Sequence, residues 1–391
     1  MRFYELFEEK NVSLLNQVPN IADIQKLGKI FDQKGYEIRL VGGVVRDLLQ
    51  NKKPKDVDLA STATPDQMIE LADENNLKYI PTGLQHGTIT FVINGEPYEI
   101  TTLRIDKETD GRHAEVEFTT DWQQDAERRD LTFNAISMGL DGEIYDYFGG
   151  ISDLKAGKSK FVGDANKRIS EDYLRILRYF RFQGRVSSPN WDQETLSSIK
   201  ENASGLEHIS GERIWMELSK ILAGNHVDQI IKYMDETGVN KMIGIKYNPD
   251  LKTIKNFTDD PVVLLASLLD NSSAADALNN RYKLSSEERD TLFFLVKNKN
   301  TKINLDEALA MHVLKKVDLG LLSKLALLQK NQSLYEKLKN TNIPQFPVNG
   351  KDLADKGIKP GPEMGKLLNS LKVKWLKSKF SATKEDLLDG V

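Results

Sequence analysis

The distribution of strand and helix patterns along the chain constrains its fold more than any other feature of the sequence. Before about Gly150, short β-type runs such as EIRLV (37–41) and TITFVI (88–93) are mixed with helical stretches, and Asn94-Gly95 predicts a hairpin. From Ile169 onward strand patterns nearly vanish, and one predicted helix follows another. We therefore predict an α+β fold in which a mixed sheet with helices is followed by a long all-α part.

Four segments carry finer predictions. DVDLA (56–60) alternates with period two and predicts a strand. Residues 105–125 are polar and predict a long loop with no more than one strand. SEDYLRILRYFRF (170–182) predicts a single helix capped by Ser170. Residues 341–365 are punctuated by proline and glycine, and we expect them to separate the last helices from the rest of the chain.

Composition excludes several classes of protein. Without cysteine, the chain cannot form a disulfide scaffold, a thiolate zinc site or a cysteine nucleophile. The five histidines show no metal-binding spacing, and we expect His86 and His113 to be surface or structural residues. No window approaches the roughly 20 apolar residues that cross a bilayer, so we expect no membrane partner. The segment MRFYELFEEKNVSLL matches neither a signal nor a transit peptide, which predicts a cytoplasmic location, with a mitochondrial or nuclear pool open for a eukaryotic source.

The charge of the chain argues against nucleic-acid binding only when it is averaged over all residues. The sequence has 54 basic and 58 acidic residues and a net charge of −4, whereas nucleic-acid-binding domains are usually basic. A binding groove, however, needs only a local excess of positive charge. Residues 366–379 contain five lysines and no acid, and residues 167–185 contain six basic side chains. We interpret the first tract either as a solvated helix face or as a surface for RNA phosphates.

Two neighbouring motifs predict phosphate and metal chemistry. Gly42 and Gly43 lie between a predicted strand and helix, where the backbone can approach a phosphate closely, and Arg46 lies one helical turn further on. Asp56 and Asp58 would project from one face of a strand, where two carboxylates repel each other unless a cation lies between them. Such oxygen ligands suit Mg²⁺, and two metal ions can activate a hydroxyl and stabilise a leaving pyrophosphate. An ordinary tight turn and a solvated acidic edge are the alternatives.

Charged residues recur at every third position of the segment from 171 to 182. They are Asp172, Arg175, Arg178 and Arg181. The apolar residues between them suit a buried helix, but a core helix has no use for three guanidiniums. We therefore expect this face either to contact a ligand or to be solvated.

Taken together and in order, these segments resemble the class II CCA-adding enzymes (tRNA nucleotidyltransferases) of the polymerase-β-like nucleotidyltransferase superfamily, and eukaryotic-type members most closely. The further matching segments are ITTLRID (100–106), AERRDLTFNAI (126–136), DYFGGISDL (146–154), EDYLRILRYFRF (171–182) and SGERIWMELSKIL (210–222). The resemblance implies template-independent addition or repair of the 3′-terminal CCA of tRNA. The substrates would be CTP, ATP and tRNA lacking part or all of CCA, the cofactor Mg²⁺, and the by-product pyrophosphate. It also implies a catalytic head (1–150), a neck that recognises the nucleotide base (151–222), a body (223–340) and a tRNA-binding tail (341–391).

The resemblance assigns roles to individual positions of the head. In the family, the positions matched by Asp56 and Asp58 hold the catalytic metal. Those matched by Gly43 and Arg46 contact the triphosphate, and that matched by Arg129 contacts the nucleotide. The superfamily also uses a third carboxylate from a neighbouring strand, for which Glu99 is our candidate and Asp110 a weaker one. For Arg128 and Arg129, a solvated pair and a structural ion pair with Glu127 or Asp130 are the alternatives.

Further roles concern the base and a flexible segment. In the family, the positions matched by Asp172 and Arg175 read the incoming base. An acceptor beside a donor fork complements the amino group and ring nitrogen that cytosine and adenine share, but not guanine or uracil. Arg178 and Arg181 would then face the triphosphate. Residues 104–121 match a flexible segment that helps the pocket switch from CTP to ATP, with Arg104 and Asp106 as levers and Asp110-Gly111 as a hinge.

Several alternatives stay open at this point. A poly(A) polymerase, or a tRNA enzyme that adds only A or only CC, would belong to the same superfamily. A non-catalytic RNA-binding protein is the alternative from another class, and loss of Asp56, Asp58 or Arg175 would mark it. None of these residues is lost. We expect either a monomer or a homodimer.

Overall fold

The structure is a computed structural model that describes residues 13–109 and 114–391. The chain divides into two compact units, the first comprising Met1–Ile221 with Lys232–Ile243 and the second Leu222–Ile231 with Gly244–Val391. Within the described residues, no helix combines the length and the apolar composition that crossing a membrane requires. The finer division predicted at residues 150, 222 and 340 stays a prediction.

A seven-stranded mixed sheet forms the centre of the first unit, with the strand order β3-β4-β5-β2-β1-β8-β9. Its strands are β1 (Ile38–Val41), β2 (Leu59–Ser61), β3 (Lys78–Gly83), β4 (Thr88–Ile93), β5 (Glu96–Thr102), β8 (Ser137–Gly139) and β9 (Ile144–Tyr145). The pairing of β2 with β5 is parallel and the other pairings are antiparallel. The predicted hairpin is confirmed, because Asn94 and Gly95 join β4 to β5 with φ angles of 54° and 87°.

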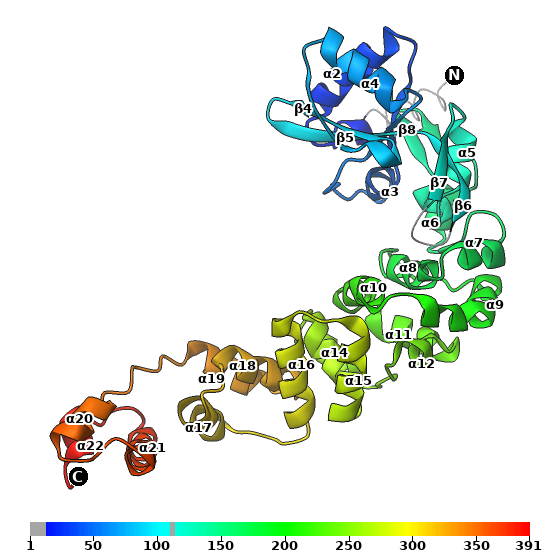
Figure 1. The fold of residues 1–391 in the computed structure, drawn as a ribbon. Helices are drawn as coiled ribbons and strands as arrows, with labels where there is room; N and C mark the ends of the chain where they lie inside the picture. The colour runs from blue at the N-terminus through cyan, green and yellow to red at the C-terminus, as the bar shows by residue number, and fades with distance from the viewer. Residues whose placement is uncertain (1–12, 110–113) are drawn as a thin grey trace. The chain divides into compact units, whose positions relative to one another are not determined.

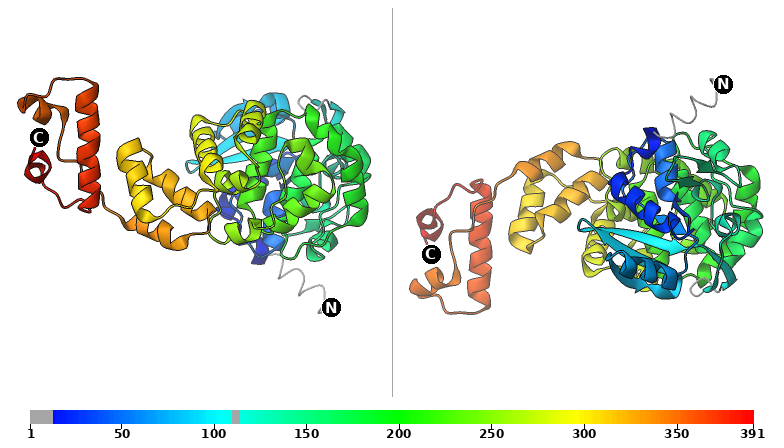
Figure 2. Two further views of the ribbon diagram at one scale, coloured as in Figure 1. Left: turned by 90° about the horizontal axis from the view of Figure 1, so that it is seen from below. Right: turned by 90° about the horizontal axis from the view of Figure 1, so that it is seen from above.

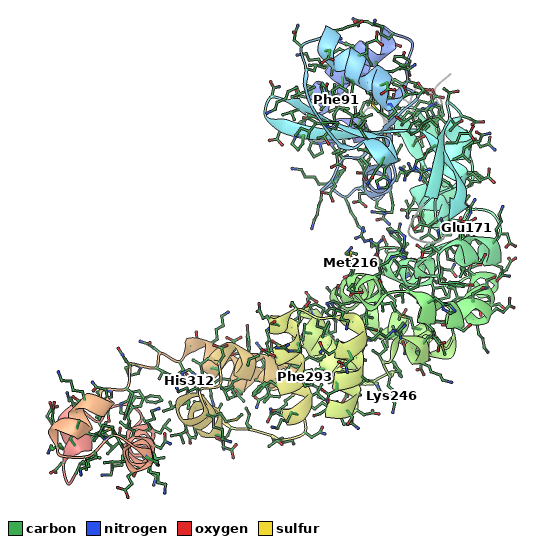
Figure 3. The ribbon with its side chains drawn as sticks, in the orientation of Figure 1. Phe91, Glu171, Met216, Lys246, Phe293 and His312 are labelled. Carbon is green, nitrogen blue, oxygen red and sulfur yellow. The ribbon has the colours of Figure 1, made fainter. Side chains whose placement is uncertain are left out.

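Two amphipathic helices, α2 (Ile21–Asp32) and α4 (Pro65–Glu74), lie together over the β4–β5 part of the sheet (Figure 1). Phe31 of α2 packs edge to face on Phe91 of β4, with ring centroids 5.8 Å apart, and both rings are fully buried. Figure 3 labels Phe91 at this position in the head. Helix α4 begins with a capping box formed by Thr64 and Gln67. These contacts fix the sheet on which the site is built.

The strand predicted for residues 56–60 is shorter than expected. Strand β1 ends at Val41, where Gly42 turns the chain with a φ of 69° into the short helix α3 (Gly43–Leu49). The amide of Val41 donates to the carbonyl oxygen of Asp58 at 3.1 Å, and β2 begins only at Leu59. Residues before Asp58 therefore have no continuing β1 backbone to pair with, and Asp56 and Asp58 lie in the segment that enters the strand.

The prediction of a loop at residues 105–125 is wrong. The segment contains β6 (Arg104–Thr109) and β7 (Ala114–Phe118), which pair antiparallel as a separate sheet, and the start of helix α5 (Trp122–Glu127). The side chain of Asp121 caps this helix by accepting from the amides of Gln123 and Gln124. Strand pairing depends on backbone hydrogen bonds, so a polar sequence does not prevent it. The predicted hinge at Asp110-Gly111 and the residue His113 lie outside the described residues.

Beyond β9 the described chain is helical, apart from an isolated bridge between Leu131 and Phe161 (Figures 1 and 2). The helices up to Ile243 are α6 (Gly150–Lys155), α7 (Ala165–Glu171), α8 (Leu174–Gln183), α9 (Gln193–Asn202), α10 (Gly211–Ala223), α11 (Val227–Glu236) and α12 (Val239–Ile243). The predicted α+β fold is thus confirmed.

The single helix predicted for residues 170–182 is two helices, because the chain breaks at Asp172. This residue follows α7 in an extended conformation with a φ of −156°, and its carboxylate accepts from the amide of Leu174 at 3.1 Å. An aspartate that caps the next helix in this way competes with continuation of the previous one.

The second unit contains helices only among its described elements. They are α13 (Leu251–Lys255), α14 (Pro261–Ser267), α15 (Ser272–Tyr282), α16 (Ser286–Asn298), α17 (Leu305–Lys315), α18 (Leu319–Leu328), α19 (Gln332–Asn340), α20 (Gly350–Asp355), α21 (Pro362–Lys377) and α22 (Lys384–Leu388). The last three helices enclose a core cluster of their own, which includes Leu353, Leu371 and Trp375. No helix is found between Asn340 and Gly350, within the segment where the proline and glycine residues predicted a separation.

The Gly149-Gly150 pair packs closely where the sheet gives way to the helices. The carboxylate of Asp146 caps α6 by accepting from the amides of Gly150 at 2.8 Å and Ile151 at 2.9 Å. A Cβ atom on Gly150 would lie only 2.3 Å from the carbonyl oxygen of Thr132. Gly149 has a φ of +73° but open space around it. Gly149 is therefore required for its left-handed backbone conformation, and Gly150 is required because it has no side chain.

We predict that Gly150→Ala lowers the free energy of unfolding of the first unit by about 3 kcal/mol, because backbone atoms of Thr132 must move. Gly149→Ala, the matched control, should cost only about 1 kcal/mol, since it adds left-handed strain without a steric clash. Urea unfolding followed by circular dichroism measures both changes. Equal losses for the two variants would contradict the close approach at Gly150.

Candidate active site

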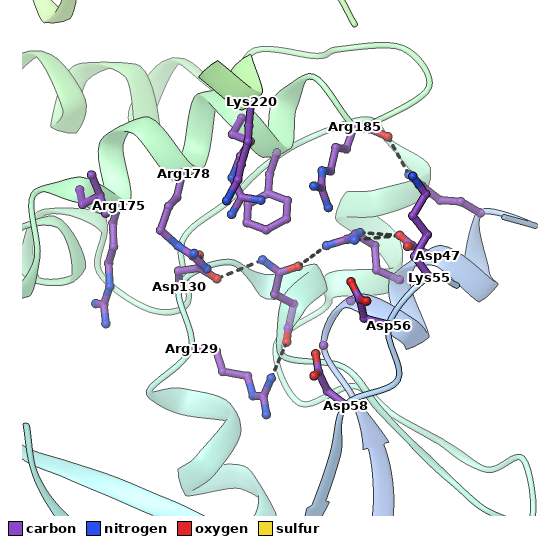
Figure 4. A pocket seen from close by; sticks show the side chains of 18 of the residues that line it. Asp47, Lys55, Asp56, Asp58, Arg129, Asp130, Arg175, Arg178, Arg185 and Lys220 are labelled. Carbon is purple, nitrogen blue, oxygen red and sulfur yellow. Dashed lines mark hydrogen bonds and ion pairs between the residues drawn. The ribbon is translucent and has the colours of Figure 1, made fainter. Parts of the chain in front are cut away.

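A cavity of about 1100 Å³ opens in the first unit, beside the Gly42-Gly43 turn and one face of α8 (Figure 4). Twelve basic and five acidic side chains line it. A concave surface with such an excess of positive charge attracts polyanions. The structure brings all seven predicted nucleotide-binding residues to this cavity. They are Gly43, Arg46, Arg129, Asp172, Arg175, Arg178 and Arg181.

The glycine turn has the geometry that the sequence predicted. Gly42 has a positive φ, which favours glycine, and a Cβ atom there would lie 3.1 Å from Nη1 of Arg129. Helix α3 starts at Gly43 without a capping side chain. The first backbone amides of α3 therefore lie next to the cavity, and no capping side chain occupies them.

Asp56 and Asp58 both line the cavity, and Figure 4 shows their carboxylates next to each other. The pKa of Asp58 is raised above its ordinary value, chiefly because the surrounding protein removes water from the carboxyl group. The negative charges of Glu99 and Asp56 raise this pKa further, whereas the guanidinium of Arg129 lowers it. The Asp58 carboxylate can still be reached from the cavity. The protein atoms that line the cavity around it remove part of its water. Clustered carboxylates of this kind are stabilised by a cation.

Glu99, the candidate third carboxylate, lies on the strand next to Asp58. In the parallel pairing of β2 with β5, Leu59 is opposite Ile100, so the residues that precede them, Asp58 and Glu99, are neighbours on the open face. Glu99 does not line the cavity. In the part of the chain that the structure describes, three or more histidines or acids do not converge into a ready-made metal site.

Arg46 is held by a hydrogen-bonded chain that runs to α8. Its guanidinium is almost fully buried and donates to Asn134 Oδ1 at 2.9 Å and to the carboxylate of Asp47. Asn134 in turn donates to Asp130 Oδ1 at 3.0 Å. The carboxylate of Asp130 accepts from Arg178 Nε at 2.7 Å. The dashed lines of Figure 4 trace this chain.

Arg129 has a different partner from those considered in the sequence. It forms an ion pair with Asp125, one turn earlier on α5, with Nη2 and Oδ2 3.2 Å apart. The same carboxylate accepts from Arg128 Nε at 2.8 Å, and these two guanidiniums hold the pKa of the buried Asp125 below its ordinary range. The alternative of an ion pair with Glu127 or Asp130 is therefore wrong in its partner, because Asp125 is the acid buried between the two arginines.

Asp172 and Arg175 lie on the cavity wall, but each is paired with another residue. Asp172 Oδ2 accepts from Arg213 Nη2 at 2.7 Å. Arg175 donates to the carbonyl oxygen of Arg168 at 2.9 Å and is hydrogen-bonded to Glu171. Figure 3 labels Glu171 at the end of α7. The polar pair predicted for base reading is thus held in place by separate partners.

Arg178 and Arg181 also line the cavity with acidic partners. Arg178 pairs with Asp130. Burial alone would raise the pKa of this carboxyl group, but the guanidinium of Arg178 and the hydrogen bond from Asn134 hold it below its ordinary range. Arg181 lies with its Nε 2.5 Å from Glu217 Oε2 of α10. Burial lowers the pKa of Arg181. Both arginines therefore stand in a partly desolvated cluster where a bound anion would interact strongly.

The predicted flexible segment is connected to the site through Asp125. The backbone amide of Arg104 donates to Asp125 Oδ1 at 3.2 Å, and its guanidinium donates to the carbonyl oxygen of His86 at 2.5 Å. Arg104 itself does not line the cavity. Asp106 belongs to β6, its side chain is outside the described parts of the structure, and Asp110 lies in the undescribed stretch.

Six basic lining residues were given no individual role from the sequence. They are Lys52, Lys53, Lys55, Arg185, Arg213 and Lys220. The run KKPK immediately before the first aspartate was a usable signal for the three lysines. Nothing local marks the others, because they reach the cavity through the packing of α8 and α10.

Comparisons with known proteins agree with this arrangement. A family model described as the poly A polymerase head domain matches residues 38–160, and one described as the probable RNA and SrmB binding site of polymerase A matches residues 190–244. The mitochondrial CCA tRNA nucleotidyltransferase 1 of Mus musculus is 45% identical over 94% of this chain and 89% of that protein. The CCA-adding enzyme of Staphylococcus epidermidis is 31% identical over 93% of this chain and 95% of that protein.

A solved structure extends the likeness to the fold. The CCA-adding enzyme of Bacillus stearothermophilus, crystallised with CTP, superposes with a TM-score of 0.76 over 94% of this chain and 95% of that chain, at 26% identity. The head model alone is shared with poly(A) polymerases, whereas these relatives match almost the entire chain. The protein is therefore a nucleotidyltransferase, and the chain belongs to the CCA tRNA nucleotidyltransferase family, whose bacterial members are called CCA-adding enzymes.

Proposed function

We propose that this protein builds or repairs the 3′-terminal CCA of tRNA, using CTP and ATP without a nucleic-acid template and releasing pyrophosphate. The observation that carries the proposal is a single basic cavity with two adjacent carboxylates, Asp56 and Asp58, and a polar pair, Asp172 and Arg175, on its walls. The carboxylates provide for nucleotidyl transfer, and the polar pair provides for choice of base. The acceptor would be a tRNA that lacks part or all of CCA.

The donor set fits a hard divalent cation, and we assign it to Mg²⁺. Two carboxylates that face a cavity, with the charge of Glu99 nearby, are the ligands that Mg²⁺ takes together with substrate phosphates. When bound, Mg²⁺ neutralises the phosphates and favours the ionised form of the attacking hydroxyl. Asp56 and Asp58 would hold it, and Glu99 would add negative charge from the next strand.

The arginines of the cavity are assigned to the nucleotide's phosphates. Gly43 and Arg46 lie at the start of α3. Arg129 lies beside Gly42, and its Nη1 donates to the carbonyl oxygen of Asn134. Arg178 and Arg181 lie on the α8 wall. A triphosphate that enters this cluster meets guanidiniums already held in position, which reduces the entropy lost on binding.

Base choice is assigned to Asp172 and Arg175. Cytosine and adenine both offer an amino donor beside a ring-nitrogen acceptor, which an aspartate and an arginine complement. Arg213 and Glu171 orient the two side chains before a nucleotide binds. Guanine and uracil would leave polar groups unpaired, at a cost of about 1–3 kcal/mol each.

The segment from Arg104 to residue 121 is proposed to assist the change from CTP to ATP, with Arg104, Asp106 and Asp110 as its participants. Its connection to the nucleotide site is Asp125, which accepts from both the Arg104 amide and Arg129. The lysine-rich helix α21 and its flanks are proposed to contact the RNA backbone. The cytoplasm is the expected compartment, with a mitochondrial pool as the second candidate because the mouse relative is named mitochondrial.

The decisive experiment uses purified protein, a tRNA transcript without CCA, and CTP with ATP. Sequencing of the product 3′ ends should yield CCA on nearly every extended molecule. Ends that stop at CC, ends that gain only A on a CC primer, or long A tracts would each assign the protein to a different activity. No extension of a transcript that the protein binds would favour a non-catalytic RNA-binding role.

We predict that Asp58→Asn lowers the rate of nucleotide incorporation by about 100- to 1,000-fold, because the neutral amide weakens the cation site. Binding of tRNA, measured by filter retention, should change little. Asp66→Asn, an exposed aspartate of α4, serves as the matched control and should retain full activity. Retained activity in Asp58→Asn would remove this carboxylate from the metal site.

We further predict that Arg175→Ala relaxes the choice of base by roughly tenfold or more, because one polar contact to the base edge is lost. Single-turnover incorporation of CTP, ATP, GTP and UTP onto the appropriate primers measures the change. Lys200→Ala, an exposed residue of α9, is the control and should discriminate like the wild type. Unchanged rejection of GTP and UTP in Arg175→Ala would overturn the assignment.

A further inference from the structure

Four guanidiniums surround one buried phenyl ring on the cavity wall. The ring is that of Phe182, near the end of α8, and its exposed fraction is 5%. The Cζ atoms that lie near its centroid are those of Arg181 at 4.2 Å, Arg46 at 5.1 Å, Arg185 at 5.4 Å and Arg178 at 5.6 Å. One ring attracts a cation through its electron-rich face, but it cannot neutralise four positive charges. We call these four side chains the arginine cage.

Three members of the cage have a carboxylate partner and one does not. Arg46 pairs with Asp47, Arg178 with Asp130, and Arg181 with Glu217. Within the described residues, Arg185 forms no ion pair. Arg185 is therefore the one guanidinium of the cage without a carboxylate at ion-pair distance in the described part of the chain.

The backbone of Arg185 is nevertheless anchored beside the glycine turn. Its carbonyl oxygen accepts from Lys52 Nζ at 3.1 Å and from Gln50 Nε2 at 3.4 Å, just beyond the end of α3. Burial and the neighbouring charge of Arg46 lower the pKa of Arg185, against the smaller opposing effects of Asp47 and Glu217. Figure 4 shows its side chain extending toward the space between α8 and the aspartates. A partly desolvated cation without an ion-pair partner is stabilised by an anion with several charges.

The ring of Phe182 is itself fixed. It packs edge to face on the fully buried Phe133, with centroids 5.9 Å apart. Arg178, Phe182 and Arg185 follow one another at helical spacing along the cavity side of α8 and its end. A fixed ring at the centre of these four arginine side chains limits the conformations that they can adopt.

We propose that Arg185 binds the polyphosphate of the incoming nucleotide, and that Phe182 is a positioning residue that holds the arginine cage around it. The inference rests on the proposed function and deepens it, because it names the part of the nucleotide that these two residues recognise. A polyphosphate carries several charges on adjacent phosphates, which matches a cluster of guanidiniums better than a monophosphate does. The base plays no part in the contact, so CTP and ATP are affected alike.

Isothermal titration calorimetry of the full chain with CTP, CMP and inorganic tripolyphosphate tests the role of Arg185. For Arg185→Ala we expect the affinity for CTP and tripolyphosphate to fall by roughly tenfold or more, and the affinity for CMP to change much less. The affinity of Arg185→Lys should lie between those of the wild type and Arg185→Ala, because lysine restores the charge but not the planar guanidinium. Arg289→Ala, an exposed arginine of α16, is the control and should bind like the wild type. Unchanged affinity for CTP, or equal losses for CTP and CMP, would overturn the role.

Steady-state kinetics test the role of Phe182. Phe182→Leu removes the aromatic face but keeps an apolar side chain, and we expect KM to rise severalfold for both CTP and ATP while kcat changes less. Phe182→Tyr keeps the ring and should restore a KM close to that of the wild type. If the Leu and Tyr variants behave alike, or if only one nucleotide is affected, Phe182 does not position the cage.

The binding experiment separates this inference from the proposed function. Wild-type protein that binds CTP, together with an Arg185→Ala variant that binds it equally well, overturns the inference alone. Wild-type protein that binds tripolyphosphate through Arg185 but transfers no nucleotide supports the anion site and overturns the proposed function. Failure of the wild type to bind either ligand overturns both.

Discussion

The arrangement of the active site depends on the hydrogen bonds made by the buried carboxylate of Asp130. It accepts hydrogen bonds from Arg178, from the side chain of Asn134 and from the amide of Leu131. Through Asn134 the same carboxylate also orients Arg46, so α3 and α8 are tied to one charge. A buried carboxylate without these donors would be strongly destabilising, so the loss of any one of them would weaken the site.

This arrangement explains how so many positive charges can share one cavity. Most of the lining arginines have an acidic partner before any nucleotide is present. The acids reduce the repulsion among the guanidiniums and fix their orientation, so that a ligand does not have to order them. The basic side chains still outnumber the acids, and this excess is available for a polyphosphate and an RNA end.

The parts of the site that the sequence predicted well are those that depend on neighbouring residues. The Gly42-Gly43 turn and the approach of Asp56 to Asp58 follow from a few adjacent positions, and both are present. The break at Asp172 was missed because Ser170 was interpreted as the start of one helix, whereas it lies inside α7, and Asp172 accepts from the first amide of α8. The hairpin of β6 and β7 was missed because the high polarity of the whole segment outweighed the alternation of AEVEF (114–118), although the backbone groups of the two strands pair normally.

By itself, the sequence determined the order of strands and helices, the motifs for phosphate and metal chemistry, and the family resemblance that the comparisons confirmed. Only the tertiary structure decided which charges are partners: Arg129 with Asp125, Asp172 with Arg213, and Arg181 with Glu217. It also decided that Arg46 and Arg185, far apart in the chain, meet at the ring of Phe182. The physical reason is that local conformation follows from adjacent residues, whereas an ion pair forms wherever packing places two side chains in the same poorly solvated space.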